Sequence, residues 1–190
     1  MKYYQREGLL PEGEKSAPNQ TDYHEGHVQR VRLIRALLGA GGLSVSVAKE
    51  VIGAVDSAEP SRAFGVAQHA MSAPRAGERE PSEVARARVV GVAQAHGWQI
   101  TESNPGIDAA ARALDGLAAI GFDAPDAYLA SYASAAATAA AADLQALSAL
   151  PTPEQQTELM VIGSVLGDPL FAGLRRLAQQ DATNDLFPNS

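Results

Sequence analysis

The sequence has no cysteine, and only 5% of its 190 residues are aromatic. The absence of cysteine excludes disulfides, thiolate metal sites, iron–sulfur clusters and thiol redox switches, because each of these needs sulfur ligands or nucleophiles. It also agrees with a reducing compartment. The sequence contains no run of about 18 apolar residues, and charged Lys2, Arg6 and Glu7 stand where a signal peptide would have its apolar core. We therefore expect a soluble, cytoplasmic protein.

The negative charge is distributed unevenly along the chain. The net charge is −7, which argues against indiscriminate binding to phosphate. Residues 1–56 contain seven Lys/Arg and seven Asp/Glu, whereas residues 57–190 contain eight Lys/Arg and fifteen Asp/Glu. The whole acidic excess therefore belongs to the second part of the chain.

The first 56 residues predict a helix end, a hairpin and two helices. Gly8 stands where a left-handed residue would end a helix over residues 2–8, and turn residues over 11–19 predict a short hairpin ending near Tyr23. From His24, apolar residues spaced by three and four predict a helix whose buried face carries Val28, Val31, Ile34 and Leu38. Ser44 or Ser46 can cap a second helix, whose predicted buried residues are Ala48, Val51, Ile52 and Val55.

The remainder of the chain predicts helices only. Residues 60–71 fit a short helix, and the polar, proline-containing residues 73–81 fit a linker. Helices are then predicted after Ser82, after Asn104, after Asp123 and from Pro153 onward, with Pro169 expected to kink or divide the last one. The predicted fold is mostly α, with a module at residues 1–56, a short helix and linker at 57–81, and a helical domain at 82–190.

One motif in this chain resembles a known family. Residues 3–10 fit the pattern Tyr-Tyr-x-Arg-x-Gly-Leu-Leu, Tyr23 closes the expected hairpin, and an arginine-rich helix follows over residues 28–38. Over residues 2–56 the sequence is similar to the DNA-binding module of the MerR family of transcription regulators. In that family the module is a winged helix-turn-helix: the motif ends the recognition helix, the hairpin is the wing, and two further helices support both. The resemblance implies that double-stranded DNA is the partner.

The resemblance also implies which residues contact DNA. Tyrosine hydroxyls and basic side chains at a helix end and a wing can hydrogen-bond phosphate oxygens, which fixes the register on the duplex without reading bases. The candidate contacts are Lys2, Tyr3, Tyr4, Arg6, Lys15, Tyr23 and Arg35. The alternative is that Tyr4 and Tyr23 pack in the core with Leu9 and Leu10, and that the arginines of the following helix form a solvated face.

The chain departs from the family pattern in two places. Residues 19–23 lack the arginine that the family's wing commonly carries, and Asp22 is nearby, so we expect weaker phosphate binding by the wing. In the family, the first helix and most of the second helix of the module would come before the residue that corresponds to Lys2, and this sequence does not contain them. We therefore expect a module truncated in its helix-turn-helix, arising from a shortened coding sequence or an engineered chain rather than from a natural variant that does not bind DNA.

Family members dimerise and sense a ligand through their C-terminal half, which implies a homodimer here, formed through residues 60–96 or through the last helix. Four aromatic residues in residues 82–190 could stack on an apolar aromatic ligand; they are Trp98, Phe122, Tyr128 and Tyr132. Packing in the core is the alternative for these residues.

Metal, cofactor and enzyme functions have little support in the sequence. His24 and His27 are three residues apart at a helix start, but without a third ligand a solvated surface is the better interpretation. No nucleophile turn, phosphate-binding loop or paired carboxylate site stands out. We therefore predict a transcription regulator of the MerR type without cofactor, metal or membrane, with a possible small organic effector. The alternative is a truncated dimerisation or effector protein that acts through protein partners without binding DNA.

Overall fold

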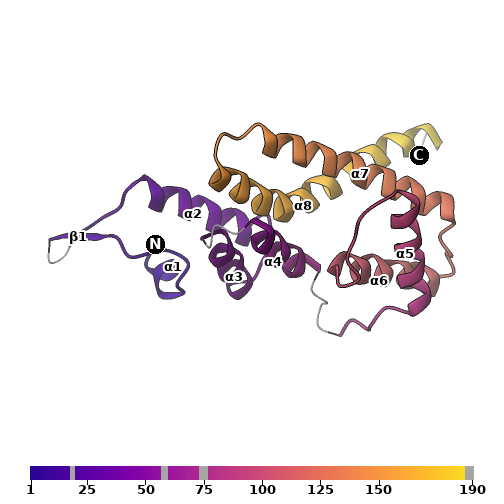
Figure 1. The fold of residues 1–190 in the computed structure, drawn as a ribbon, viewed down its shortest axis with the longest axis horizontal. Coiled ribbons are helices and arrows are strands. Elements are labelled where there is room, and N and C mark those ends of the chain that lie inside the picture. Colours follow the sequence, from indigo (N-terminus) through magenta and orange to yellow (C-terminus); the bar gives the residue numbers. More distant parts are fainter. Residues whose placement is uncertain (18–19, 57–59, 73–76, 187–190) are drawn as a thin grey trace. The chain divides into compact units, whose positions relative to one another are not determined.

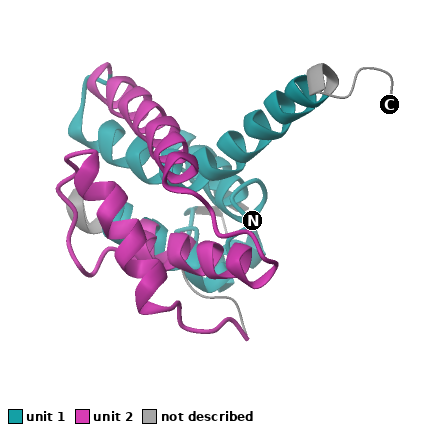
Figure 2. Cartoon of the chain, turned by 90° about the vertical axis from the view of Figure 1, so that its right-hand side faces the viewer, with its two compact units in different colours: residues 1–67, 150–190 teal, residues 68–149 magenta. Residues whose placement is uncertain are grey.

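The computed structural model describes residues 1–17, 20–56, 60–72 and 77–186, and it is mostly helical, as the sequence predicts (Figure 1). The described chain forms eight helices and one two-stranded antiparallel sheet. It divides into two compact units, residues 1–67 with 150–190 (unit 1) and residues 68–149 (unit 2), which Figure 2 shows in teal and magenta. The elements in chain order are α1 (Lys2–Arg6), β1 (Glu14–Ala17), β2 (Gln20–Asp22), α2 (Glu25–Leu38), α3 (Val45–Asp56), α4 (Pro60–Ser72), α5 (Glu83–Ala95), α6 (Pro105–Ala119), α7 (Asp126–Ser148) and α8 (Pro153–Leu186).

Unit 1 begins with a short helix that ends where the sequence predicts. Gly8 has φ +72°, a left-handed conformation that glycine adopts without steric cost. This turn lets the backbone N–H groups of Leu9 and Leu10 donate to the Tyr4 carbonyl at 2.8 and 3.2 Å. Both leucine side chains are buried. The turn therefore anchors α1 to the hydrophobic core of unit 1.

The predicted hairpin is present. Strands β1 and β2 pair with Glu14 opposite Asp22 and Lys15 opposite Thr21, and the register shifts before Ala17. Because Glu14 and Asp22 are directly opposite, two like charges face each other at the base of the hairpin, which is unfavourable for pairing and concentrates negative charge there.

Helix α2 begins with a cap formed by two histidines. His24 Nδ1 accepts from the Gly26 N–H at 3.2 Å, and His27 Nδ1 accepts from the His24 N–H at 3.3 Å. This leaves His27 Nε2 to donate to the Glu12 carbonyl at 3.4 Å. His27 is only 3% exposed, so the prediction of a solvated surface is wrong for this residue. The histidine pair instead accepts hydrogen bonds from two backbone N–H groups at the helix start, those of His24 and Gly26.

The buried face of α2 is rotated from the predicted one. Ile34 is buried as predicted, but Val28 is 37% exposed, and the side chains that join Ile34 in the core are His27, Leu33 and Leu37. The apolar residues of this helix fit two overlapping faces at helical spacing, and only the packing partners select one of them.

Helices α3 and α8 complete the core of unit 1. Ser44 caps α3 by accepting from the Val47 N–H at 3.3 Å. The N-terminal half of α8 contacts α2 and α3, and Val161 and Val165 are almost fully buried. A Cβ at Gly41 would lie 2.4 Å from Val165 Cγ1, so the turn between α2 and α3 must be glycine at this point. The predicted boundaries placed all of residues 82–190 in one domain, whereas residues 150–190 belong to the same compact unit as the N-terminal module.

The sequence predicts that Pro169 kinks or divides the last helix; α8 continues through this residue, so division is wrong. Proline removes one backbone N–H donor, and the hydrogen bonds of the neighbouring turns keep the helix intact. By length and composition alone, Pro153–Thr183 is long and apolar enough to cross a membrane. In this structure, however, Thr157, Val161 and Val165 are buried, so part of the apolar surface of α8 packs inside unit 1.

Unit 2 contains α5, α6 and α7, packed around a small core of Ala85, Ala111, Leu114 and Ala124. Ser82 caps α5 as predicted, accepting from the Ala85 N–H at 3.1 Å. Ser82 also donates to Asp115 of α6, from its N–H at 2.6 Å and from its hydroxyl at 2.7 Å. These hydrogen bonds lower the pKa of Asp115, so its carboxylate is the form that joins the two helices.

A second polar connection between α5 and α6 is made by Arg86. Its guanidinium donates to both carboxylate oxygens of Asp108, at 2.7 and 3.1 Å, and also pairs with Glu83 and Glu80. The hydrogen bond from Arg86 lowers the pKa of Asp108. The charged residues of α5 and α6 are thus largely committed to holding unit 2 together.

Candidate nucleic-acid interface

Helix α1 presents an exposed surface of aromatic and basic side chains. Tyr3 is 48% exposed, and the Arg6 guanidinium lies 5.4 Å from the centre of its ring. The Arg6 side chain is 74% exposed and makes a 3.4 Å ion pair with Glu7. Lys2 is exposed as well. The structure therefore brings three of the predicted DNA contacts, Lys2, Tyr3 and Arg6, to one short helix.

Tyr4 has a more structural position than Lys2, Tyr3 and Arg6. It is partly buried, its ring centre lies 5.7 Å from that of Tyr3, and its carbonyl accepts the two hydrogen bonds that end α1. The alternative interpretation, in which residues of the motif pack in the core, is confirmed for Leu9 and Leu10, which are buried. Tyr4 thus contributes to the end of α1 through its carbonyl, and its ring lies beside that of Tyr3.

The hairpin contributes less to a basic surface than the predicted wing. The side chain of Lys15 lies outside the described residues. Tyr23 is 36% exposed, and its ring packs edge-on against His27 with ring centres 5.3 Å apart. Since Glu14 and Asp22 are exposed and directly opposite, the described part of the hairpin carries negative charge.

The arginines of α2 have different surroundings. Arg30 is mostly buried and pairs with Asp56 at the end of α3, so it connects two helices of the core. Arg32 is exposed and lies 4.0 Å from Glu25 on its own helix. Arg35 is exposed, and among the described residues no hydrogen bond or ion pair links its side chain to α1. Only Arg32 and Arg35 fit the solvated face that the alternative interpretation predicts.

Lys49 also lies beside the end of α1, a position that the spacing of residues in the sequence does not predict. A Cβ at Gly8 would lie 2.9 Å from Lys49 Nζ, so the ammonium group of this α3 residue sits beside the turn that ends α1. Lys49 is 41 positions from Gly8 in the sequence, and no periodicity relates two residues so far apart. Only the tertiary structure shows that this side chain lies beside the turn after α1.

The four aromatic residues proposed for an effector do not form one group. Phe122, Tyr128 and Tyr132 contact one another, with ring centres 5.4 and 4.7 Å apart, and the Tyr128 hydroxyl donates to the Tyr132 hydroxyl at 3.0 Å. Trp98 instead packs on His96, at 5.4 Å. His96 lies 3.4 Å from the hydroxyl of Ser134, which is two residues after Tyr132 and hence on nearly the opposite side of α7.

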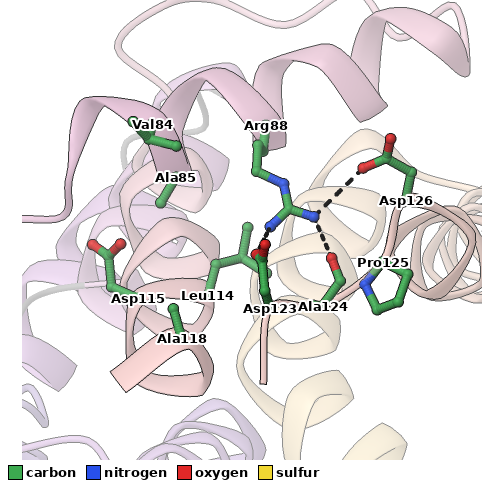
Figure 3. Close-up of a pocket in the computed structure, with 10 residues that line it drawn as sticks. All are labelled: Val84, Ala85, Arg88, Leu114, Asp115, Ala118, Asp123, Ala124, Pro125 and Asp126. Atoms are coloured by element: carbon green, nitrogen blue, oxygen red, sulfur yellow. Dashed lines mark hydrogen bonds and ion pairs between the residues drawn. The ribbon is translucent and has the colours of Figure 1, made fainter. Parts of the chain in front are cut away.

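Unit 2 contains a pocket of about 450 Å³ at a different place (Figure 3). Its apolar surface is continuous with the core of the unit, and Arg88 forms one wall, paired with Asp123 at 3.1 Å and Asp126 at 3.5 Å and hydrogen-bonded to the Ala124 carbonyl. None of the four predicted aromatic residues lines it. The lining residues are Val84, Ala85, Arg88, Leu114, Asp115, Ala118, Asp123, Ala124, Pro125 and Asp126.

The fold and the α1 surface define a class of protein, a mostly helical regulator with a helix-turn-helix type of N-terminal module. The family model described as MerR HTH family regulatory protein matches residues 1–54. The chain is also similar to a solved structure, SCO5550 from Streptomyces coelicolor A3(2), described as a candidate transcriptional regulator. The TM-score is 0.73 and the identity 28%, covering 100% of this chain and 91% of that chain. Comparison with curated proteins gives no match. The first 54 residues therefore match the MerR helix-turn-helix family, and the chain as a whole is similar to a transcriptional regulator.

Proposed function

We propose that this regulator binds double-stranded promoter DNA through the surface of α1. The observation that carries the proposal is the grouping of Lys2, Tyr3 and Arg6 on one exposed helix, with the arginine stacked on the tyrosine ring. Such side chains hydrogen-bond phosphate oxygens and set the position of a protein on the duplex. The acidic pair in the hairpin, Glu14 and Asp22, supports a smaller contribution from the wing than the family pattern implies.

Fluorescence anisotropy with a promoter fragment from beside the protein's own gene, measured over a series of salt concentrations, tests this function. The logarithm of the affinity falls linearly with the logarithm of the salt concentration, and each phosphate contact makes this slope steeper by about 0.9. Arg6→Gln should make the slope shallower by about one and should weaken binding to all DNA sequences alike. Arg176→Gln removes an equal charge from an exposed position on α8 and serves as the matched control. Equal effects of the two substitutions would contradict a specific role for α1.

We also propose that the regulator is a homodimer and that α8 forms its interface. Four large apolar residues near the end of α8 are 40–65% exposed and recur at helical spacing; they are Leu170, Phe171, Leu174 and Leu177. A row of exposed, large apolar side chains along one helix commonly marks a protein interface. Leu174→Glu should produce a monomer in sedimentation equilibrium with an unchanged helical CD spectrum. Leu144→Glu, on exposed α7, is the control and should leave the mass unchanged.

The same stripe is the observation that favours the second candidate function, in which the chain acts through protein partners without binding DNA. A stable dimer that does not bind the promoter fragment at low salt would support that function over the first one. In either case we propose a cytoplasmic protein without catalytic activity, cofactor or metal.

We further propose that a small organic effector binds in the pocket beside Arg88 rather than among the predicted aromatic residues. A pocket of about 450 Å³ has the size of sites that hold small molecules. A thermal-shift screen of metabolites should give compounds that stabilise the chain, and Ala118→Leu should abolish their effect because the larger side chain fills the pocket. Stabilisation that persists in Ala118→Leu would exclude this site.

A further inference from the structure

The position of Lys49 carries one inference beyond the residues that the motif supplies. In α3 the neighbouring residues Ala48, Val51 and Ile52 are buried, while Lys49 is exposed. The helix thus fixes the backbone of Lys49 through its packed side and directs the lysine outward. Its Nζ reaches the turn after α1, 2.9 Å from where a Cβ of Gly8 would lie, with Cε at 3.3 Å.

The charge at this point is not compensated by a carboxylate. Among the described residues Lys49 forms no ion pair, and Glu7, the acidic residue of the same turn, pairs with Arg6 at 3.4 Å. Lys2 and Arg6 on α1 and Lys49 beside the turn that follows are thus all exposed cations, and Glu7 is engaged by Arg6. A strongly hydrated ammonium group with free donors suits a contact with a phosphate oxygen.

We propose that Lys49 is a further phosphate contact of this regulator, held beside the turn after α1 by a helix, α3, that packs on α2 and α8. The inference rests on the proposed DNA-binding function and adds a contact from a second helix. A contact surface built from two elements constrains the orientation of a duplex more than α1 alone, which has only five residues. A competing explanation is structural, because a cation near the last carbonyls of a helix also stabilises that helix.

Two substitutions separate charge from packing. Lys49→Met keeps the aliphatic stem and removes the ammonium group, whereas Lys49→Arg keeps the charge. The anisotropy assay uses the full chain and the promoter fragment. We expect Lys49→Met to make the slope of log affinity against log salt shallower by about one and to weaken binding roughly five- to ten-fold. Lys49→Arg should restore both quantities to within about two-fold of the unsubstituted chain.

The outcomes distinguish the possible failures. A Lys49→Met chain with unchanged affinity and slope, while Arg6→Gln is impaired, would overturn the contact but leave the DNA-binding function standing. If Lys49→Met also speeds hydrogen–deuterium exchange in residues 1–10 without DNA, the lysine stabilises α1, and the proposed contact is overturned. If the unsubstituted chain does not bind the fragment at any salt concentration, the proposed function fails, and this inference fails with it.

Discussion

The packing of α8 on α2 and α3 leads to a measurable prediction for Val165→Ala. Val165 is 1% exposed, and its Cγ1 atom lies against the glycine turn at Gly41. The substitution removes two buried methyl groups, each contributing about 0.8 kcal/mol. Because the turn backbone cannot easily move into the space left, a cavity adds to this loss, and we expect a total destabilisation of about 2 kcal/mol.

Urea unfolding followed by far-UV CD measures this change, and Leu144→Ala is the control. Leu144 lies on α7, outside the proposed dimer interface, and is 65% exposed, so its truncation should change the free energy of unfolding by less than about 0.5 kcal/mol. Hydrogen–deuterium exchange should also become faster in α2 and α3 of Val165→Ala. If Val165→Ala is no more destabilising than Leu144→Ala, α8 does not pack on the N-terminal module in solution, and the grouping of unit 1 is wrong.

Two further predictions concern local features of the units. Gly8→Ala should destabilise the chain by about 1–2 kcal/mol in urea unfolding, because φ is +72° and the new Cβ would meet Lys49. Gly53→Ala, in the middle of α3 with open space around it, should instead be neutral or stabilising by up to about 1 kcal/mol, and the reverse order of these two variants would refute the turn geometry. The second prediction is a pH dependence. Since the hydrogen bonds from Ser82 lower the pKa of Asp115, the carboxylate stabilises the folded state at neutral pH, and this stability is lost as the pH falls through that lowered pKa. Asp115→Asn should therefore be less stable at pH 7 and lose less on acidification, whereas Asp143→Asn on exposed α7 should follow the unsubstituted chain; an identical acid dependence in both variants would contradict the assignment.

Local features were predicted well because they depend on neighbouring residues. The end of α1 at Gly8, the hairpin, the Ser44 and Ser82 caps and the spans of most helices follow from turn chemistry and helical period, which act over a few residues. The errors arose where packing chooses between local options. Two faces of α2 were compatible with its period, and Pro169 did not interrupt α8.

Long-range arrangement could be decided only by the tertiary structure. The sequence by itself determined a mostly helical chain, the distribution of its charge and the motif on α1 that identifies the family. It could not determine that α8 packs with the first module, that Lys49 lies beside Gly8, or that Trp98 is separated from the Tyr128 pair. The physical reason is that helical period fixes how residues are placed around one helix, whereas contacts between helices depend on which surfaces bury each other, and no local pattern encodes that choice.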